Sequence, residues 1–183
     1  MQKETPASVT LLVRTSTIQI PEDALVVLCG PAACGKSAFA ARFFKPTQIV
    51  STDGCRALIA DDPANQKVSG RAFEVFHFLI RQRLELHRLT VADSTALERS
   101  ARRDLQQLAR ECRRPVVLIV FQVPLDVCLE RNAQRRRVVE REVIEAHLVK
   151  LAAALENIHA EGFDRVYVLD EKTMDTAQIY MAS

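Results

Sequence analysis

Residues 30–37 read GPAACGKS, and they constrain the fold of this chain more than any other stretch. The apolar run ALVVLC (24–29) precedes them and AFAARFF (38–44) follows them. This order predicts a buried strand, a glycine-rich turn and a helix that begins near Lys36, which is the context that G-x-x-x-x-G-K-[ST] needs to bind a nucleoside triphosphate. A chance match is disfavoured because two of the five glycines occupy the required positions.

The residue types of this loop suit phosphate chemistry. Gly30 and Gly35 allow the backbone to direct successive N–H groups at phosphate oxygens, and the helix start adds partial positive charge. Lys36 is expected to reach the β- and γ-phosphates, and the Ser37 hydroxyl to ligate Mg²⁺. The residues expected to bind ATP, or another nucleoside triphosphate, are Gly30, Pro31, Ala32, Ala33, Cys34, Gly35, Lys36, Ser37 and Ala38.

Apolar runs alternate with helical periodicity along the chain, which predicts an α/β fold with a mainly parallel, five-stranded sheet covered by helices on both faces. The five expected strands are 24–29, 48–52, 89–93, 116–121 and 165–169, and a loosely alternating stretch in 1–20 is expected to add a strand extension. We expect a single domain over 1–183, with ligands at the carboxyl ends of the strands.

Three helices are predicted from apolar residues spaced three and four apart. Their apolar stripes are Phe73, Phe76, Ile80 and Leu84; Leu97, Ala101, Leu105, Leu108 and Cys112; and Ile144, Leu148, Leu151, Leu155 and Ile158. Gly162 is expected to close the last helix, and Pro124 to lie in the first turn of a further one.

The bulk composition narrows the class of protein. With 183 residues, 48% of them apolar and 26% charged, the chain suits one globular domain, and a net charge of +2 does not by itself argue for nucleic acid. The five cysteines form no C-x-x-C pair, which favours reduced thiols. The four histidines lie far apart and favour helix positions over metal ligation. No apolar run approaches a membrane span and no signal core is visible, so we expect a cytoplasmic protein without membrane contact.

Acidic residues follow two predicted strands. Asp53, in STDGCR, could take a proton from an attacking hydroxyl, and Arg56 one helical turn on could grip an anionic acceptor. The alternative is a helix cap with a surface arginine. Asp93, in VAD, could hold Mg²⁺ or its water shell, or could simply begin a turn.

A basic run, ERNAQRRRVVER (130–141), carries two arginines that share a helix face, Arg131 and Arg135. On a mobile segment they could neutralise charge on the transferred phosphoryl group. Arg136 and Arg137 are better explained as a solvated face. A second basic region, RSARRD (99–104) with RECRR (110–114), could contact a polyanion.

Together these stretches resemble the 5′-hydroxyl polynucleotide kinase domain of the bacterial RNA-repair enzymes that join kinase, phosphatase and ligase modules. The resemblance runs from about Leu25 to Leu169. It rests on LVVLCGPAACGKS, FFKPTQIVSTDGCR, ADDPANQKVSGRAFEVFHF, LTVADST, VPLDVCLERN and EGFDRVYVL. It implies an adenylate-kinase-like P-loop fold with an arginine-bearing lid at 130–142.

The resemblance also implies roles. Lys36 and Ser37 would hold the phosphates and Mg²⁺, Asp53 would be the general base on a 5′-hydroxyl of RNA or DNA, and Arg56 would bind the adjacent phosphate. Arg131 and Arg135 would act on the transferred group. The implied partners are phosphatase and ligase modules of a longer chain and an RNA 3′-end methyltransferase.

The chain departs from the family pattern at three places. Ala33 replaces a third glycine of the loop, Ala96 replaces the asparagine of D-A-T-N, and the lid is one residue shorter after Arg135. Two other functions use the same loop: a kinase of a small-molecule hydroxyl, such as a sugar or an antibiotic, and a non-catalytic nucleotide switch, which would need no general base.

Overall fold

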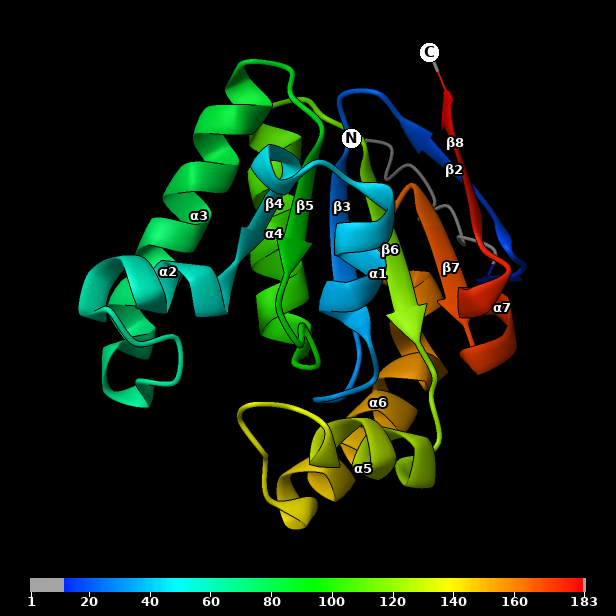
Figure 1. Cartoon of the computed structure of the whole chain (residues 1–183). Helices are drawn as coiled ribbons and strands as arrows, with labels where there is room; N and C mark the ends of the chain where they lie inside the picture. Colours follow the sequence, from blue (N-terminus) through cyan, green and yellow to red (C-terminus); the bar gives the residue numbers. More distant parts are fainter. Residues whose placement is uncertain (1–11, 183) are drawn as a thin grey trace, which may run out of the picture.

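A computed structural model describes residues 12–182 and places six strands in one sheet (Figure 1). In spatial order these are β1 (Leu12–Arg14), β7 (Arg165–Leu169), β6 (Val116–Phe121), β3 (Leu25–Cys29), β5 (Thr90–Asp93) and β4 (Ile49–Ser51). Every pair in the sheet is parallel. All five expected strands are present, and β1 adds a sixth because it pairs with the edge strand β7. The part of the strand extension expected in 1–11 lies outside the described residues.

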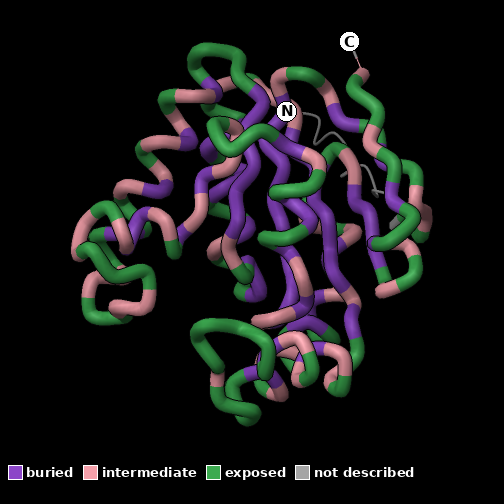
Figure 2. The backbone as a smooth tube through the Cα atoms, in the orientation of Figure 1, coloured by how far each residue is buried: buried purple, intermediate pink, exposed green. Residues whose placement is uncertain are grey.

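The central strands are buried on both faces, as their unbroken apolar runs predict. All five residues of β3 and all six of β6 are buried, and Figure 2 shows these strands buried along their length. Alternate side chains enter two clusters: Val27 and Leu118 belong to one, Val26 and Val117 to the other.

Helices cover both faces of the sheet (Figure 1). α3 (Ser69–Glu85) and α4 (Arg99–Glu111) supply residues to one cluster, and α1 (Lys36–Phe43) and α7 (Glu171–Asp175) supply residues to the other. α6 (Arg141–Asn157) supplies Leu151 to the first cluster and Ile144 to the second. The remaining helical elements are α2 (Thr52–Ala60), α5 (Leu125–Ala133) and the 3₁₀ turns Pro46–Gln48, Gln66–Val68 and Ile158–Ala160. In the described chain no helix is long and apolar enough to cross a membrane.

Two predicted helix details differ in the structure. The buried stripe of α3 is Ala72, Phe76, Ile80 and Leu84, whereas Phe73 is 42% exposed. The buried residues are spaced strictly four apart, so Ala72 takes the place expected for Phe73. Phe73 is turned toward solvent, where its ring contacts Phe76 and His77. α6 ends at Asn157 rather than near Gly162, which instead turns the chain at φ 85° after the last 3₁₀ turn.

A second, two-stranded sheet was only half expected. β2 (Thr17–Pro21) pairs in parallel with β8 (Gln178–Ala182), and two of its residues, Ile18 and Ile20, reach the core. β8 has no clear apolar pattern, because most of its side chains are exposed, so the sequence did not reveal it.

Candidate phosphate-transfer site

The phosphate loop lies between the central strand β3 and α1. Gly35 adopts φ 107°, and a Cβ added at Gly30 would lie 3.0 Å from the Cβ of Phe121 on β6. Both glycines are therefore required, one for conformation and one for space. Ala33 adopts φ 62° in the same loop, which is a left-handed conformation that favours glycine.

Lys36 is buried within the loop that it would serve. Its ammonium donates to the carbonyl oxygens of Gly30 at 3.0 Å and Pro31 at 2.7 Å. Within the described chain the N–H groups of Ala33, Cys34 and Gly35 have no acceptor. Unpaired N–H groups, a cation and the start of α1 together form a cradle for phosphate oxygens.

Ser37 and Asp93 meet beneath this cradle. The Ser37 hydroxyl donates to Asp93 Oδ2 at 2.7 Å. Burial raises the pKa of Asp93, Asp53 raises it further, and the Ser37 hydrogen bond, Lys36 and Arg135 oppose the rise. A hydroxyl and a carboxylate oxygen are donors that suit Mg²⁺, which completes its octahedron with water and phosphate. The pair therefore fits the expected metal, and the turn alternative for Asp93 does not account for its burial.

Asp53 is not the cap of its helix. Ser51 caps α2 by accepting from the N–H of Gly54 at 2.9 Å, so Asp53 lies in the first turn with a side chain that is 53% exposed. The cap interpretation of Asp53 therefore fails. Its charge acts on Asp93, which places both carboxylates at the same edge of the sheet.

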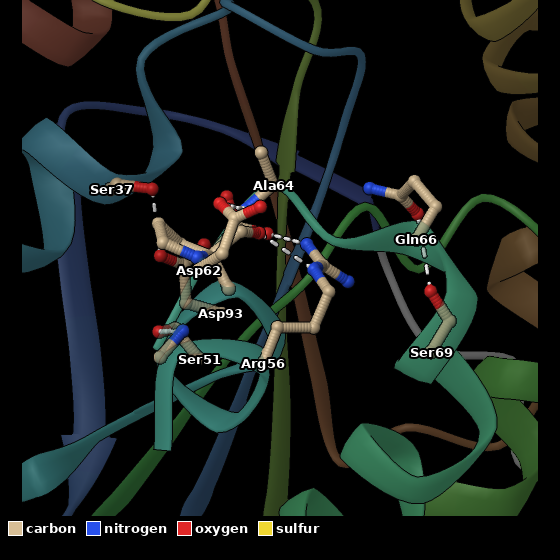
Figure 3. A network of polar contacts seen from close by, with 11 residues as sticks. Ser37, Ser51, Arg56, Asp62, Ala64, Gln66, Ser69 and Asp93 are labelled. Atoms are coloured by element: carbon tan, nitrogen blue, oxygen red, sulfur yellow. Dashed lines mark hydrogen bonds and ion pairs between the residues drawn. The ribbon is translucent and has the colours of Figure 1, made fainter. Parts of the chain in front are cut away.

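Arg56 links Asp53 to the segment that follows α2. Its Nη2 donates to Asp53 Oδ1, and its Nε donates to the carbonyl of Pro63 at 2.8 Å. In the view of Figure 3 the guanidinium points toward Asp62 and Ala64, and Ser37 and Asp93 lie on the same side of it. The side chain is 8% exposed, so the surface-arginine interpretation fails as well. Among the described residues its Nη1 has no hydrogen-bond partner.

The two expected lid arginines occupy different environments. Arg131, on α5, donates to the carbonyl of Cys34 at 2.7 Å and lies 3.7 Å from Glu171 on α7. Arg135 follows α5, is exposed and affects the pKa of Asp93 through its charge. Arg136 and Arg137 are exposed, as predicted for a solvated face. Thus Arg131 contacts the loop, and Arg135 lies within electrostatic reach of its metal side.

The sequence patterns did not indicate a role at the site for His147, Arg102 or Glu161. His147 on α6 accepts a hydrogen bond from the Ala32 N–H at 3.2 Å. Arg102, which is 1% exposed, forms a buried ion pair with Glu161 and donates to the carbonyls of Ala96 and Leu97 at 2.9 and 2.7 Å. The carbonyl of Thr95, which precedes Ala96, accepts a hydrogen bond from the Gly30 N–H at 3.0 Å. The Arg102–Glu161 pair therefore supports the phosphate loop through the segment 95–97.

The cysteines are free thiols, as predicted. Burial raises the pKa of Cys29 to about 11 and that of Cys128 to about 11, so both are protonated, unreactive core residues at neutral pH. No group of three or more potential His, Cys, Asp or Glu ligands is found in residues 12–182.

A glycine-rich phosphate loop at the carboxyl edge of an all-parallel sheet, with helices on both faces, defines the class: a nucleotide-binding P-loop kinase fold. Within it the chain belongs to the AAA domain family, whose model matches residues 25–158.

One curated relative and two solved structures are similar to this chain. L-seryl-tRNA(Sec) kinase of Methanococcus maripaludis is 28% identical over 161 residues, which are 84% of this chain and 60% of the relative. The chain thus spans about 60% of that relative's length. A gluconokinase from Sinorhizobium meliloti superposes with a TM-score of 0.53 at 18% identity, covering 82% of this chain and 84% of its own. A chain of the Pnkp1/Rnl/Hen1 complex gives 0.52 at 20%, covering 64% and 40%. These two structures are similar in fold alone.

Proposed function

We propose that this chain transfers the γ-phosphoryl group of ATP to a 5′-hydroxyl at the end of an RNA or DNA strand. The observation that carries the proposal is the position of Asp53. It is a half-exposed carboxylate, bonded to Arg56, at the edge of the sheet where Ser37 and Asp93 form the metal position. A nucleotide switch has no use for a carboxylate there, whereas a kinase needs a proton acceptor.

Each side chain of the site has a separate role in the proposed reaction. Asp53 accepts the proton of the attacking hydroxyl, and the Arg56 bond fixes its orientation. Lys36 and Arg135 stabilise the charge of the transferred group, while Arg131 holds the loop through the Cys34 carbonyl. Mg²⁺, when bound at Ser37 and Asp93, supplies further neutralisation of phosphate charge. Little covalent chemistry is required of the protein, so positioning and electrostatics set the rate.

Arg56 supports a phosphate-bearing acceptor. Two of its nitrogens are occupied by Asp53 and Pro63, and Nη1 is left to donate to an anion next to the accepted hydroxyl. A terminal 5′-hydroxyl of a strand has such a neighbour, namely the first phosphodiester. A neutral sugar or antibiotic does not offer one.

A second candidate is phosphorylation of a serine hydroxyl carried by a tRNA. The relative that covers 84% of this chain is named for seryl-tRNA(Sec), and the same carboxylate would accept the proton of that hydroxyl. Both candidates place the acceptor hydroxyl on a nucleic acid. They differ in which hydroxyl reaches Asp53.

The test is transfer of label from [γ-³²P]ATP to three acceptors: a 5′-hydroxyl RNA, seryl-tRNA and gluconate. We expect label on the RNA oligonucleotide, removed by a 5′-phosphatase. Label on seryl-tRNA alone would select the second candidate, and label on gluconate alone would select a small-molecule kinase. Absence of transfer to all three would contradict the kinase proposal.

Asp53→Asn and Arg56→Gln separate the roles of the pair. Asp53→Asn should abolish transfer while ATP still binds, because it removes the proton acceptor and keeps a similar shape. Arg56→Gln should raise the KM for RNA and leave ATP affinity unchanged. Loss of ATP affinity in Arg56→Gln would show that Arg56 belongs to the nucleotide side. Arg88→Gln, which removes an exposed cation just before β5, at the end of that strand opposite Asp93, is the control.

A further inference from the structure

Four residues of α4 form one polar stripe on the helix. Arg99, Arg103, Gln106 and Arg110 are spaced four, three and four apart, so they share a face. They line a cavity of about 470 Å³ together with Ser100 and Glu161. The stripe belongs to the basic region 99–114, which the phosphate-transfer site does not use.

The cavity wall presents donors and no free anion. Both oxygens of Glu161 accept from Arg102, at 2.5 and 2.7 Å, so the only carboxylate in the lining is already paired. Arg103 is exposed and lies 3.9 Å from Asp104, a distance too long for a firm pair in water. Arg110 donates to the carbonyl of Gly162 at 3.3 Å and is otherwise exposed. The lining therefore carries an excess of positive charge.

Gln106 adds an observation of a different kind. It is only 3% exposed, lines the cavity, and its Nε2 has no hydrogen-bond partner within the described chain. Buried amide groups are almost always paired, so an unpaired one in a cavity wall indicates an acceptor that comes from a ligand.

We propose that this cavity, the α4 groove, is a second binding site, which takes a phosphate group carried by a ligand of about nucleotide size. Arginine guanidinium groups and an amide N–H together match the oxygens of a phosphate, and the one carboxylate in the lining is already paired with Arg102. Its volume lies within the range of ligand pockets and exceeds that of a lone phosphate ion. The inference does not depend on the proposed function.

The groove is separate from the phosphate loop but connected to it. Arg102 directly precedes Arg103 on α4. Its guanidinium joins Glu161, in the groove wall, to the carbonyls of Ala96 and Leu97. That segment follows Asp93, and its Thr95 carbonyl binds the first glycine of the loop. A nucleotide bound in the phosphate loop therefore does not occupy the α4 groove. The loop can be kept saturated with nucleotide while binding to the groove is measured.

The test measures binding of two probes while saturating ADP and Mg²⁺ fill the loop. One probe is a short fluorescent single-stranded RNA with a 5′-phosphate, followed by anisotropy; the other is inorganic pyrophosphate, followed by calorimetry. The groove variant is Arg99→Gln with Arg103→Gln. The matched control, Arg88→Gln with Arg113→Gln, removes two exposed arginines outside the groove lining.

We expect the groove variant to bind one probe about tenfold more weakly than the control does, with a salt slope reduced by about 1.4 for RNA, or ~0.7 per lost phosphate contact. Weakened RNA binding identifies a strand phosphate as the ligand, and weakened pyrophosphate binding identifies a free phosphate compound. Equal affinity of both variants for both probes would overturn the proposal. Kinase activity on RNA is recorded separately, so its absence would count against the proposed function and not against the groove.

Gln106→Leu provides a second, independent measurement. It removes the unpaired amide and keeps the volume, so the free protein should melt at a higher temperature while the affinity for the effective probe falls several-fold. A melting temperature that rises without any loss of affinity would exclude Gln106 from the site.

Discussion

His147 of α6 accepts a hydrogen bond from the backbone N–H of Ala32, with 3.2 Å between Nδ1 and the amide nitrogen. The bond ties the helix after the lid segment to the phosphate loop, and it exists only while Nδ1 carries no proton. Burial lowers the pKa of His147 from its ordinary value of 6.5, and the charges of Lys36 and Lys150 lower it further.

This geometry predicts acid-sensitive stability. Because the folded pKa lies below the unfolded one, the unfolded state binds more protons as the pH falls below about 6.5, and stability declines through that window. His147→Asn keeps an acceptor near the Nδ1 position and does not titrate. Urea unfolding at several pH values should therefore show a smaller decline in the variant than in the wild type. His77, whose pKa is also lowered by burial, is common to both proteins and cancels in the comparison. If stability declined equally with falling pH in both proteins, His147 would not be the source of the acid sensitivity.

The buried carboxylate of Asp93 is predicted to cost stability. Its folded pKa is raised, above all by burial, so ionising it at neutral pH opposes folding, and the loss disappears below its unfolded pKa. Asp93→Asn should raise the melting temperature at neutral pH and not at low pH. The same variant should lower phosphoryl transfer by about two orders of magnitude or more, since it removes the anionic member of the proposed Mg²⁺ position. A variant both less stable and fully active would contradict the assignment.

Ala33 is predicted to be a strained position. At φ 62° an alanine is disfavoured by about 1 kcal/mol relative to glycine, so Ala33→Gly should leave stability unchanged or raise it by up to that amount. Ala41→Gly, at an exposed position of α1, is the control and should lose about 1 kcal/mol. Denaturant unfolding of both variants gives the comparison, and equal losses at the two positions would show that Ala33 is not strained.

The buried pair of Arg102 and Glu161 predicts strong non-additivity. Arg102→Met leaves the Glu161 carboxylate buried without a partner and should cost about 3–5 kcal/mol of unfolding free energy. The double variant with Glu161→Leu should recover a large part of this loss, because no isolated charge remains. A double-mutant cycle in urea measures the coupling. A double variant that loses the sum of the two single losses would exclude the coupling.

The sequence was sufficient for the parts of this molecule that are continuous in the chain. The buried runs of β3 and β6, the glycine turn and the start of α1 at Lys36 are local patterns, and each forms where it was predicted. The position of Asp53 and Asp93 at one edge follows from the parallel order of their strands. Fold and loop were thus predictable from residue type and spacing.

Contacts between distant segments were not predictable. His147 and Ala32 are separated by 115 residues, and Arg102 and Glu161 by 59. Nothing in a single histidine or arginine of an amphipathic helix distinguishes a loop contact from a surface position. The basic run 99–104 predicts a helix surface for Arg102 as for Arg99 and Arg103, and only the packing of α4 shows that Arg102 is buried while the other two are exposed.

Arg131 and Arg135 are predicted to have different roles: Arg131 stabilises the structure, and Arg135 affects the rate of transfer. Arg131 is bonded to the Cys34 carbonyl and approaches Glu171, so Arg131→Ala should lower both the melting temperature and the affinity for ATP. Arg135 is exposed, and in the described chain its side chain has no hydrogen bond or ion pair, so Arg135→Ala should leave the melting temperature unchanged.

Arg135→Ala should instead lower kcat by about 10³-fold, since an arginine that neutralises the transferred phosphoryl group acts on the transition state. Its matched control is Arg136→Ala, which removes another exposed cation one residue away and should keep kcat. Single-turnover transfer and thermal melting of the three variants provide the measurements. Similar kcat values for Arg135→Ala and Arg136→Ala would remove Arg135 from the reaction and leave Arg131 as the arginine that contacts the phosphate loop.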